Sequence, residues 1–290
     1  MSRLAQTMSN VAASSDRDWC KSGEHAPRDI TAFKFAPERT LAHFVVKLGN
    51  APGALENSAA LATKHRIKVV SGFHSSSSSS GEGFWSFFAD FADSDIKPNE
   101  FASELEFLPS ALEVCFKVPR NGLLVDSFHF PVRLSGERAV IMPTESLASI
   151  FTRVVGVFGD GSAARVMLSQ MGQAAGKTAM RNLLEQLGPE TVKKELESVI
   201  GLYSTSGWGI FDLVSSNIDA ARADIRVLDN FECVNFKGSS VPRSNFLRGH
   251  IAGMFTELVR SRVDVAENKC VAMGDSVCNF VVQASPSDEV

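Results

Sequence analysis

Apolar and polar residues follow two regular patterns in the first half of the chain. Four segments are rich in β-branched and aromatic residues, which is typical of strands: residues 41–49, 66–73, 83–92 and 110–118. Two segments between them carry apolar residues at helical spacing: residues 51–65 and 97–108. The order strand, helix, strand, strand, helix, strand predicts a ferredoxin-like βαββαβ sheet with two helices on one face.

The second half combines longer helical patterns with further strands. Helices are predicted at residues 145–159, 163–187, 189–203 and 244–262. Strands are predicted at residues 207–217 and 222–236, and a closing Cys-containing hairpin over residues 263–283. The turn of this hairpin is assigned to Gly274, Asp275 and Ser276. The chain is therefore expected to be α+β, with a mixed α/β second domain.

Glycines interrupt the helix predicted over residues 163–187, whose buried side is assigned to Val166, Met171, Leu183 and Leu184. Gly172 and Gly176 each lower helix stability by about 1 kcal/mol relative to Ala. Something must therefore approach this backbone closely. A helix of the same core is the interpretation that we favour, and a dimer partner or a ligand is the alternative.

Two segments lack periodicity. Residues 1–38 mix Ser, Ala, Asp and Lys and are predicted to form a disordered tail. Six consecutive serines, Ser75 to Ser80, are predicted to form a flexible hairpin loop. The chain crosses to its second module near residue 119, so the predicted domains are residues 39–119 and 120–285.

Composition limits the possible partners. A chain of 290 residues has room for two domains, and a net charge of −4 provides no general attraction to nucleic acids or anionic membranes. No apolar run reaches the roughly 18–20 residues that span a bilayer, so we expect a cytoplasmic protein that binds neither membranes nor nucleic acid. The five cysteines are odd in number and widely spread, which favours reduced thiols or a metal site over a disulfide framework.

The closing hairpin brings Glu267, Cys270 and Cys278 close together in sequence. Zinc is bound by thiolates and carboxylates in roughly tetrahedral sites, so these residues would need a fourth ligand. The odd interval between Glu267 and Cys270 places them on opposite faces of a regular strand, and their convergence requires a bulge or twist. Spacing alone therefore favours buried structural cysteines over a metal site.

The segment KLGNAPGALENSAALATKHRIKVVSGF resembles the first half of an ACT domain. In that family a Pro-Gly-containing turn lies where amino acids or other small effectors bind. The resemblance implies that such an effector would contact this turn: Asn50, Pro52, Gly53 and Ala54. Asn50 replaces the aspartate of many ACT domains. A helix-initiating turn without a ligand stays an equal alternative.

Five ordered stretches resemble the 4-vinyl reductase (4VR) domain family: GERAVIMPTESLASIF, GWGIFDLV, DNFECVNF, FLRGHIAGMF and ENKCVAMGDSVCNF. The family includes sensor domains of phenol-responsive activators, archaeal stand-alone proteins and a subunit linked to bacteriochlorophyll vinyl reduction. The resemblance implies that Glu267, Cys270 and Cys278 bind zinc. Where the sensors carry another cysteine, this chain has Ser244. The fourth ligand would then be Cys233, His250 or water, and a metal-free hairpin with packed thiols stays the alternative.

In the phenol sensors an apolar cavity near the metal holds the aromatic effector. The resemblance implies such a pocket here, lined by Trp208, Phe211, Phe231, Phe246, His250 and Met254. Each of these residues could instead belong to the core. No residue pattern indicates a catalytic triad, a zinc-protease motif or a nucleotide-binding loop, so no catalytic residue is assigned.

The first functional hypothesis is a cytosolic regulatory protein that senses an apolar or aromatic small molecule, with a possible second effector at the ACT-like turn. We expect a homodimer whose output passes to a partner protein. One alternative is an accessory or catalytic component of a tetrapyrrole vinyl reductase, although the sequence shows no flavin or nicotinamide site. Another is a scaffold that resembles the small subunits of vesicle-tethering complexes.

Overall fold

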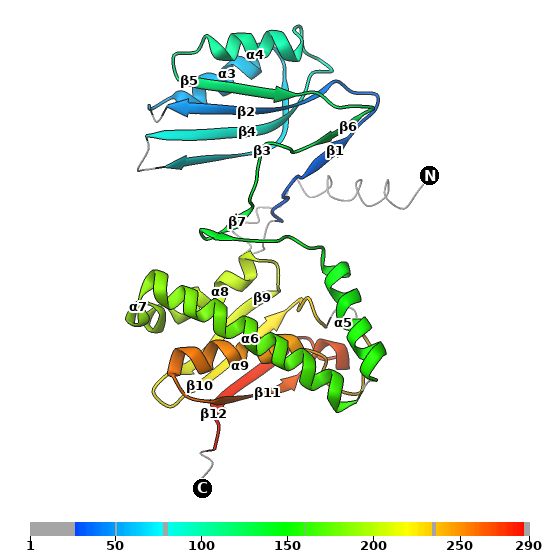
Figure 1. Cartoon of the computed structure of the whole chain (residues 1–290), viewed down its shortest axis with the longest axis vertical. Coiled ribbons are helices and arrows are strands. Elements are labelled where there is room, and N and C mark those ends of the chain that lie inside the picture. Colours follow the sequence, from blue (N-terminus) through cyan, green and yellow to red (C-terminus); the bar gives the residue numbers. More distant parts are fainter. Residues whose placement is uncertain (1–26, 50, 78–80, 160, 234–235, 287–290) are drawn as a thin grey trace. The chain divides into compact units, whose positions relative to one another are not determined.

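The computed structural model describes residues 27–49, 51–77, 81–159, 161–233 and 236–286 (Figure 1). The chain forms two compact units, the first ending at Ala139 and the second beginning at Val140. The predicted boundary at residues 119/120 lies about twenty residues too early. The reason is that β6 (Leu123–Val125) pairs with β1 (Phe33–Phe35) and so belongs to the first unit.

Strand β1 also corrects the expectation of a disordered tail, because residues 33–35 are part of a two-stranded sheet. Residues 1–26 of the predicted tail lie outside the described residues. A second short hairpin, β7 (Arg133–Leu134) with β8 (Glu137–Arg138), ends the first unit.

The first unit has the predicted order of elements between residues 41 and 117. They are β2 (Leu41–Gly49), α3 (Ala54–Lys64), β3 (Lys68–Ser77), β4 (Glu82–Asp90), α4 (Pro98–Glu106) and β5 (Ala111–Lys117). The strands form one antiparallel sheet in the order β3-β4-β2-β5. Strand β3 extends through Ser77, which pairs with Glu82, so half of the predicted serine loop is a strand, while residues 78–80 lie outside the described residues.

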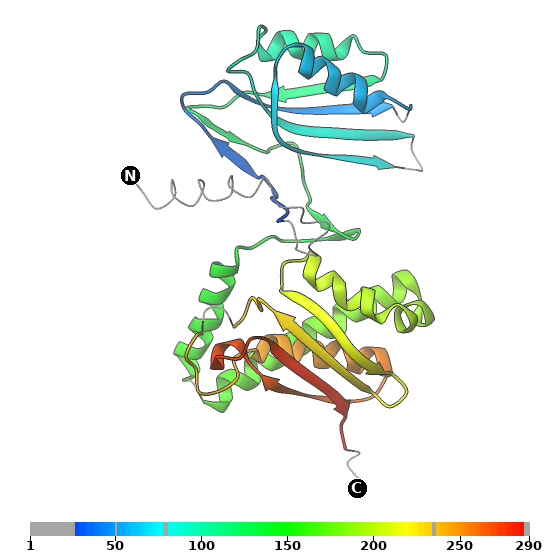
Figure 2. The same ribbon diagram turned by 180° about the vertical axis from the view of Figure 1, so that it is seen from behind.

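The two faces of this sheet are different. Helices α3 and α4 lie on the same face in both views (Figures 1 and 2), and Phe44, Phe87 and Phe101 belong to the core between them and the sheet. Side chains alternate between the two faces along a strand. His43 in β2 therefore lies on the face that α3 and α4 leave uncovered, where β6 and the residues after it pass.

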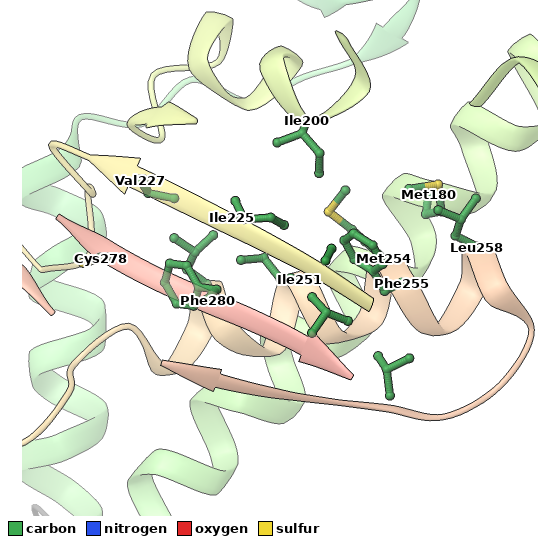
Figure 3. Close-up of a cluster of buried hydrophobic side chains, with 14 of the residues drawn as sticks. Met180, Ile200, Ile225, Val227, Ile251, Met254, Phe255, Leu258, Cys278 and Phe280 are labelled. Carbon is green, nitrogen blue, oxygen red and sulfur yellow. The ribbon is translucent and has the colours of Figure 1, made fainter. Parts of the chain in front are cut away.

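The second unit places four helices before and one within an antiparallel sheet. The elements are α5 (Thr144–Phe158), α6 (Ser162–Leu187), α7 (Pro189–Lys194), α8 (Leu196–Thr205), β9 (Ile210–Asn217), β10 (Arg222–Leu228), α9 (Asn245–Val259), β11 (Val263–Lys269) and β12 (Cys278–Ala284). The strand order is β11-β12-β10-β9. Figure 3 shows apolar side chains of β10 and β12 gathered against α9, among them Ile225, Val227, Phe280, Ile251 and Met254.

Helices α6 and α9 pack against each other through glycines. A Cβ atom on Gly176 would lie against the carbonyl oxygen of His250, and one on Gly249 against that of Ser169, both far inside van der Waals contact. The close approach is therefore made by a helix of the same core, as we favoured from the sequence. The buried face of α6 was assigned wrongly, because Val166 and Met171 are 58% and 41% exposed. The buried residues follow a four-residue interval instead: Ala164, Leu168, Gly172, Gly176, Met180 and Leu184.

Within the part of the chain that the structure describes, no helix combines the length and the apolar character needed to cross a membrane.

Candidate functional site

Four potential metal ligands converge in the second unit: Cys233, Glu267, Cys270 and Cys278, which we call the thiol cluster. One ligand atom from each residue lies within 4.8 Å of the others. Cys233 follows β10, Glu267 lies in β11, Cys270 follows β11 and Cys278 begins β12. The three cysteines are fully buried. The predicted ligands Glu267, Cys270 and Cys278 are thus brought together, and Cys233 joins them.

A bulge resolves the strand geometry that argued against convergence. Glu267 pairs with Phe280 and Lys269 pairs with Asn279, so one extra residue of β11 lies between these two pairs. Such an insertion bends a strand and re-aims its side chains. The chain then leaves the sheet at Cys270, whose backbone N–H donates a hydrogen bond of 2.8 Å to the carboxylate of Asp275. The odd interval is therefore compatible with a shared site.

Hydrogen-bond donors surround the sulfur atoms. Sγ of Cys278 accepts from the backbone N–H of Val271 at 3.4 Å and from Nδ2 of Asn230 at 3.3 Å. Sγ of Cys270 lies 3.4 Å from Sγ of Cys233. Donation from the two neighbouring thiols and from these N–H groups lowers the pKa of Cys278 to about 3, and the same thiol contacts raise the pKa of Cys233. At least one thiolate is therefore stabilised inside the core.

Ser244 lies in the middle of this cluster. Its hydroxyl donates to Oε1 of Glu267 at 2.7 Å and lies 2.9 Å from Sγ of Cys233. Ser244 is buried and also accepts a hydrogen bond from Nδ2 of Asn230 at 2.8 Å. Cys233 thus places a thiol beside the position where the resemblance led us to expect one.

The residues present fit a zinc ion. Zinc–thiolate bonds of about 2.3 Å in a tetrahedral site separate neighbouring sulfur atoms by about 3.8 Å. The Cys233–Cys270 sulfur separation of 3.4 Å is close to this value. Burial raises the pKa of Glu267 to about 8, and its carboxylate oxygen lies within the same 4.8 Å limit. Three thiols and one carboxylate form a closed four-ligand set.

The alternative fourth ligand, His250, lies in a different group of side chains. We call this group the aromatic cluster: Tyr203, Trp208, Phe211, Phe231, Phe246 and His250. The ring centroids of Trp208 and His250 are 4.7 Å apart, and those of Trp208 and Phe231 are 5.1 Å apart. Five of the six residues predicted to line a pocket are therefore in one cluster. The sixth, Met254, is almost fully buried in the core.

The aromatic cluster contains one buried polar pair. Nε2 of His250 lies 2.9 Å from the hydroxyl of Tyr203. Nδ1 of His250 is buried and has no hydrogen-bond partner within the described residues. Burial lowers the pKa of His250 to about 4 and raises that of Tyr203, so both are neutral at pH 7. Tyr203 was missed at the level of the sequence, although it is the single tyrosine of the chain.

Glu232 connects the two clusters and was also missed. Its carboxylate accepts the backbone N–H groups of Phe246 at 2.9 Å and Leu247 at 2.8 Å, which are unpaired donors of the first turn of α9. Burial raises the pKa of Glu232 to about 8. The neighbouring residues Phe231 and Cys233 belong to the aromatic and thiol clusters. A single turn after β10 thus holds α9 and both clusters together.

Two open cavities lie along α6 and α9, away from the predicted pocket residues. They have volumes of about 310 and 570 Å³, and both are lined by Ser169, Gln170 and Arg248. None of the six predicted pocket residues lines either cavity.

The ACT-like turn lies in the first unit and is described in part. Gly53 adopts a left-handed conformation with φ of 84° at the N-terminus of α3, and Pro52 is exposed. Ala54 is buried in the core, and Asn50 lies outside the described residues. The turn is thus placed to begin a helix, and its ligand-binding role stays a prediction.

Comparison with known proteins identifies a domain of the second unit. Residues 223–284, from β10 to β12, match the family model of the 4-vinyl reductase (4VR) domain. The 4VR resemblance is therefore confirmed for this segment, which contains all four residues of the thiol cluster.

Similar structures were found at low sequence identity. The phenol-responsive sensory domain of the transcription activator PoxR, solved with phenol, is 18% identical, with 53% of this chain and 80% of that chain covered and a TM-score of 0.46. A vinyl-4-reductase family protein from Methanocaldococcus jannaschii is 18% identical, with 51% and 85% covered and a TM-score of 0.35. A trafficking protein particle complex subunit 3 from Naegleria fowleri is 20% identical, with 49% and 95% covered and a TM-score of 0.38. No curated protein matches significantly.

Proposed function

We propose that the protein is a small-molecule-sensing regulator whose 4VR-containing unit binds an apolar or aromatic ligand at the aromatic cluster. The observation that carries this proposal is the buried His250 side chain, whose Nδ1 has no partner among the described residues and is surrounded by aromatic rings. Small-molecule sites combine apolar walls with a few polar anchors. A ligand hydroxyl would satisfy the free nitrogen, and Tyr203 would hold the imidazole in place.

The turn after β10 supports a path from ligand to protein response. Phe231 contacts the ligand site, Glu232 holds the start of α9, and Cys233 is part of the thiol cluster. A ligand that moves Phe231 would therefore also change the position of α9. A ligand shifts a conformational equilibrium only by its difference in affinity for the two states.

In this proposal the thiol cluster is a structural zinc site held by Cys233, Glu267, Cys270 and Cys278. Bound zinc would supply a cross-link between the turn after β10 and the β11–β12 segment. The N–H groups of Val271 and Asn230 would then stabilise the thiolate of Cys278, as second-sphere donors do. Four protein ligands leave no open position, which is characteristic of structural sites rather than catalytic ones.

The first unit enters the proposal as a ferredoxin-like, ACT-like domain with a possible second effector site at Pro52, Gly53 and Ala54. The antiparallel order β3-β4-β2-β5 and the left-handed Gly53 before α3 support this role. A homodimer with a partner protein as output completes the proposal. Its support is the row of exposed apolar residues on α5 and α6, among them Val157, Phe158, Val166 and Met171.

The test is a thermal-shift and calorimetric screen of the full chain against phenols, indoles, isoprenoids, tetrapyrroles and amino acids. A ligand at 100 times its Kd stabilises the folded state by about 2.7 kcal/mol. We expect a hydroxylated aromatic compound to bind wild type and to bind Phe231→Ala at least tenfold more weakly. Phe107→Ala, which changes an 87% exposed ring of the first unit, is the matched control. Absence of binding by every compound class would overturn the proposal.

A further inference from the structure

A second group of metal-ligand residues lies in the first unit, separate from the thiol cluster. His43 in β2, Asp126 and His129 each offer one ligand atom within 4.8 Å of the others, and we call them the imidazole cluster. Asp126 and His129 follow β6, whose residue Leu124 packs against Leu41 and Phe88. The segment after β6 thus crosses the face of the sheet that α3 and α4 leave uncovered.

His43 supplies the observation that points to a ligand. Its side chain is 1% exposed, and its Nε2 lies 2.9 Å from the hydroxyl of Ser86. Its Nδ1 is buried without a hydrogen-bond partner in the described part of the chain. The nearest carboxylate oxygen, Oδ1 of Asp126, is 3.9 Å from Nδ1, which is too far for a hydrogen bond. An unpaired buried nitrogen of this kind costs about 1–3 kcal/mol unless a ligand satisfies it.

The other two members face the same point. Nδ1 of His129 lies 2.8 Å from Oδ2 of Asp126. The carboxylate of Asp126 also accepts the backbone N–H of Phe128 at 3.0 Å and that of His129 at 3.3 Å. Its orientation is therefore set by its own chain segment, with an oxygen directed at His43.

We propose that His43, Asp126 and His129 bind a divalent first-row transition ion such as Zn²⁺ or Co²⁺. Imidazole nitrogens and one carboxylate suit these ions. Bonds of about 2.1 Å separate ligand atoms by about 3.0 Å at right angles and about 3.4 Å in a tetrahedron. The observed separations of 2.8 Å and 3.9 Å lie on either side of these values. The ion satisfies Nδ1 of His43, and the proton shared by His129 and Asp126 is released to solvent.

The surroundings prepare the site for binding. Ser86 holds His43 from the far side of the ring, as second-sphere residues commonly do. The ring of His43 stacks on Phe88 with centroids 4.3 Å apart, and the ring of Phe73 lies 5.0 Å from that of His129. Lys117, the basic residue that faces the cluster from β5, donates to the hydroxyl of Ser127 at 2.6 Å. The ligands are thus oriented before an ion arrives.

Exposure distinguishes this site from the thiol cluster. The side chains of Asp126 and His129 are 19% and 28% exposed, so the ion can enter from solvent. Three protein ligands leave at least one coordination position for water or for a small anionic or nitrogen-containing molecule.

The test is a titration of the metal-free full chain with Co²⁺, read by calorimetry and by absorbance. We expect two ions per chain, one with a sulfur-to-cobalt charge-transfer band from the thiol cluster and one without it. Asp126→Asn and His129→Ala should each weaken the sulfur-free ion at least tenfold and leave the charge-transfer band unchanged. Both residues are partly exposed, so these variants should fold.

His65→Gln is the matched control. His65 is also a buried histidine beside carboxylates, but both of its ring nitrogens have partners, Asp95 at 3.2 Å and Glu104 at 3.0 Å. This variant should bind both ions like wild type. A wild-type chain that binds only the sulfur-ligated ion, or Asp126→Asn and His129→Ala variants that keep the sulfur-free ion at wild-type affinity, would overturn the proposal.

Discussion

The thiol cluster and the imidazole cluster place potential metal ligands in opposite settings. The thiol cluster has four ligand residues, and its three cysteines are fully buried within the core of the second unit. The imidazole cluster has three ligand residues, of which only His43 is buried, and it lies on one face of a sheet. The first arrangement can replace part of a hydrophobic core, whereas the second is added to a core that is already complete.

This difference follows from where each unit places its helices. In the first unit α3 and α4 cover one face of the sheet and form a core with it that includes no member of the imidazole cluster. In the second unit Cys233, Cys270 and Cys278 belong to the core itself. We therefore expect stability to depend on the thiol cluster and its supports, and ion exchange to be easier at the imidazole cluster.

The largest effect should come from the glycine contact that holds α9 under the thiol cluster. Gly249→Val places side-chain atoms against the backbone carbonyl of Ser169, which can move only if α6 and α9 separate. We expect a loss of about 3 kcal/mol or more in the free energy of unfolding of the second unit. Chemical denaturation of the full chain measures it, and the first unit should unfold as in wild type.

Gly201→Ala is the control for this prediction. Gly201 lies in α8, and a Cβ atom there has no neighbour within 4 Å. Replacing an unhindered helical glycine by alanine stabilises a helix by about 0.4–1 kcal/mol. Equal destabilisation by both substitutions would mean that close packing of α6 against α9 is not the cause.

The next effect concerns the closed thiol set. With zinc at 100 times its Kd, wild type should gain about 2.7 kcal/mol of stability. Cys270→Ser should lose the ion and this gain, because serine is a poor zinc ligand. Metal analysis and thermal unfolding with and without a chelator measure both quantities. Cys115→Ser, in β5 of the first unit, should behave like wild type; zinc retention by Cys270→Ser would contradict a role for this thiol.

A smaller effect should appear on acidification. The folded-state pKa of His250 is about 4 and its ordinary value is 6.5, so the unfolded chain binds the proton more readily between these values. The stabilising contribution is complete above pH 6.5 and is lost as the pH falls toward 4. At pH 5.5 the loss is about 1.4 kcal/mol.

Denaturation at pH 7 and pH 5.5 tests this prediction by the difference between wild type and His250→Gln. The variant should lack this part of the pH dependence. Tyr203→Phe keeps the imidazole and should retain the dependence, although it loses the 2.9 Å hydrogen bond. The same pH dependence in wild type and His250→Gln would assign the acid sensitivity to other groups.

The fold was largely predictable where local pattern and packing agree. Strand β2 has the predicted bounds, residues 41–49, because its alternating large apolar residues suit a sheet covered on one face. The buried face of α6 was not predictable from hydrophobicity, since the contact with α9 is made by Gly172 and Gly176 while Val166 faces outward. Small residues are selected there by backbone proximity, which a hydrophobic pattern does not report.

The candidate sites were predictable only in part, for a similar reason. Glu267, Cys270 and Cys278 are close in sequence, but their convergence depends on a bulge that no local signal marks. His43 and Asp126 meet because β6 pairs with β1 and then crosses the sheet, which is a long-range event. Glu232 resembles any strand carboxylate in the sequence, and its role depends on where α9 begins.

The smallest expected effect is also the sharpest test of how the thiol cluster is assembled. Cys233 and Ser244 come from different segments, yet their side-chain atoms lie only 2.9 Å apart. Cys233→Ser should weaken zinc binding at least tenfold because one thiolate is lost. The double variant Cys233→Ser with Ser244→Cys moves the thiol back by this short distance and should restore affinity to within a factor of about ten, or about 1.4 kcal/mol. Competition with a chromogenic chelator measures both affinities. Restoration would show that the site requires a thiol at this place and tolerates either segment as its source, whereas an equally weak double variant would mean that the backbone after β10 positions the ligand.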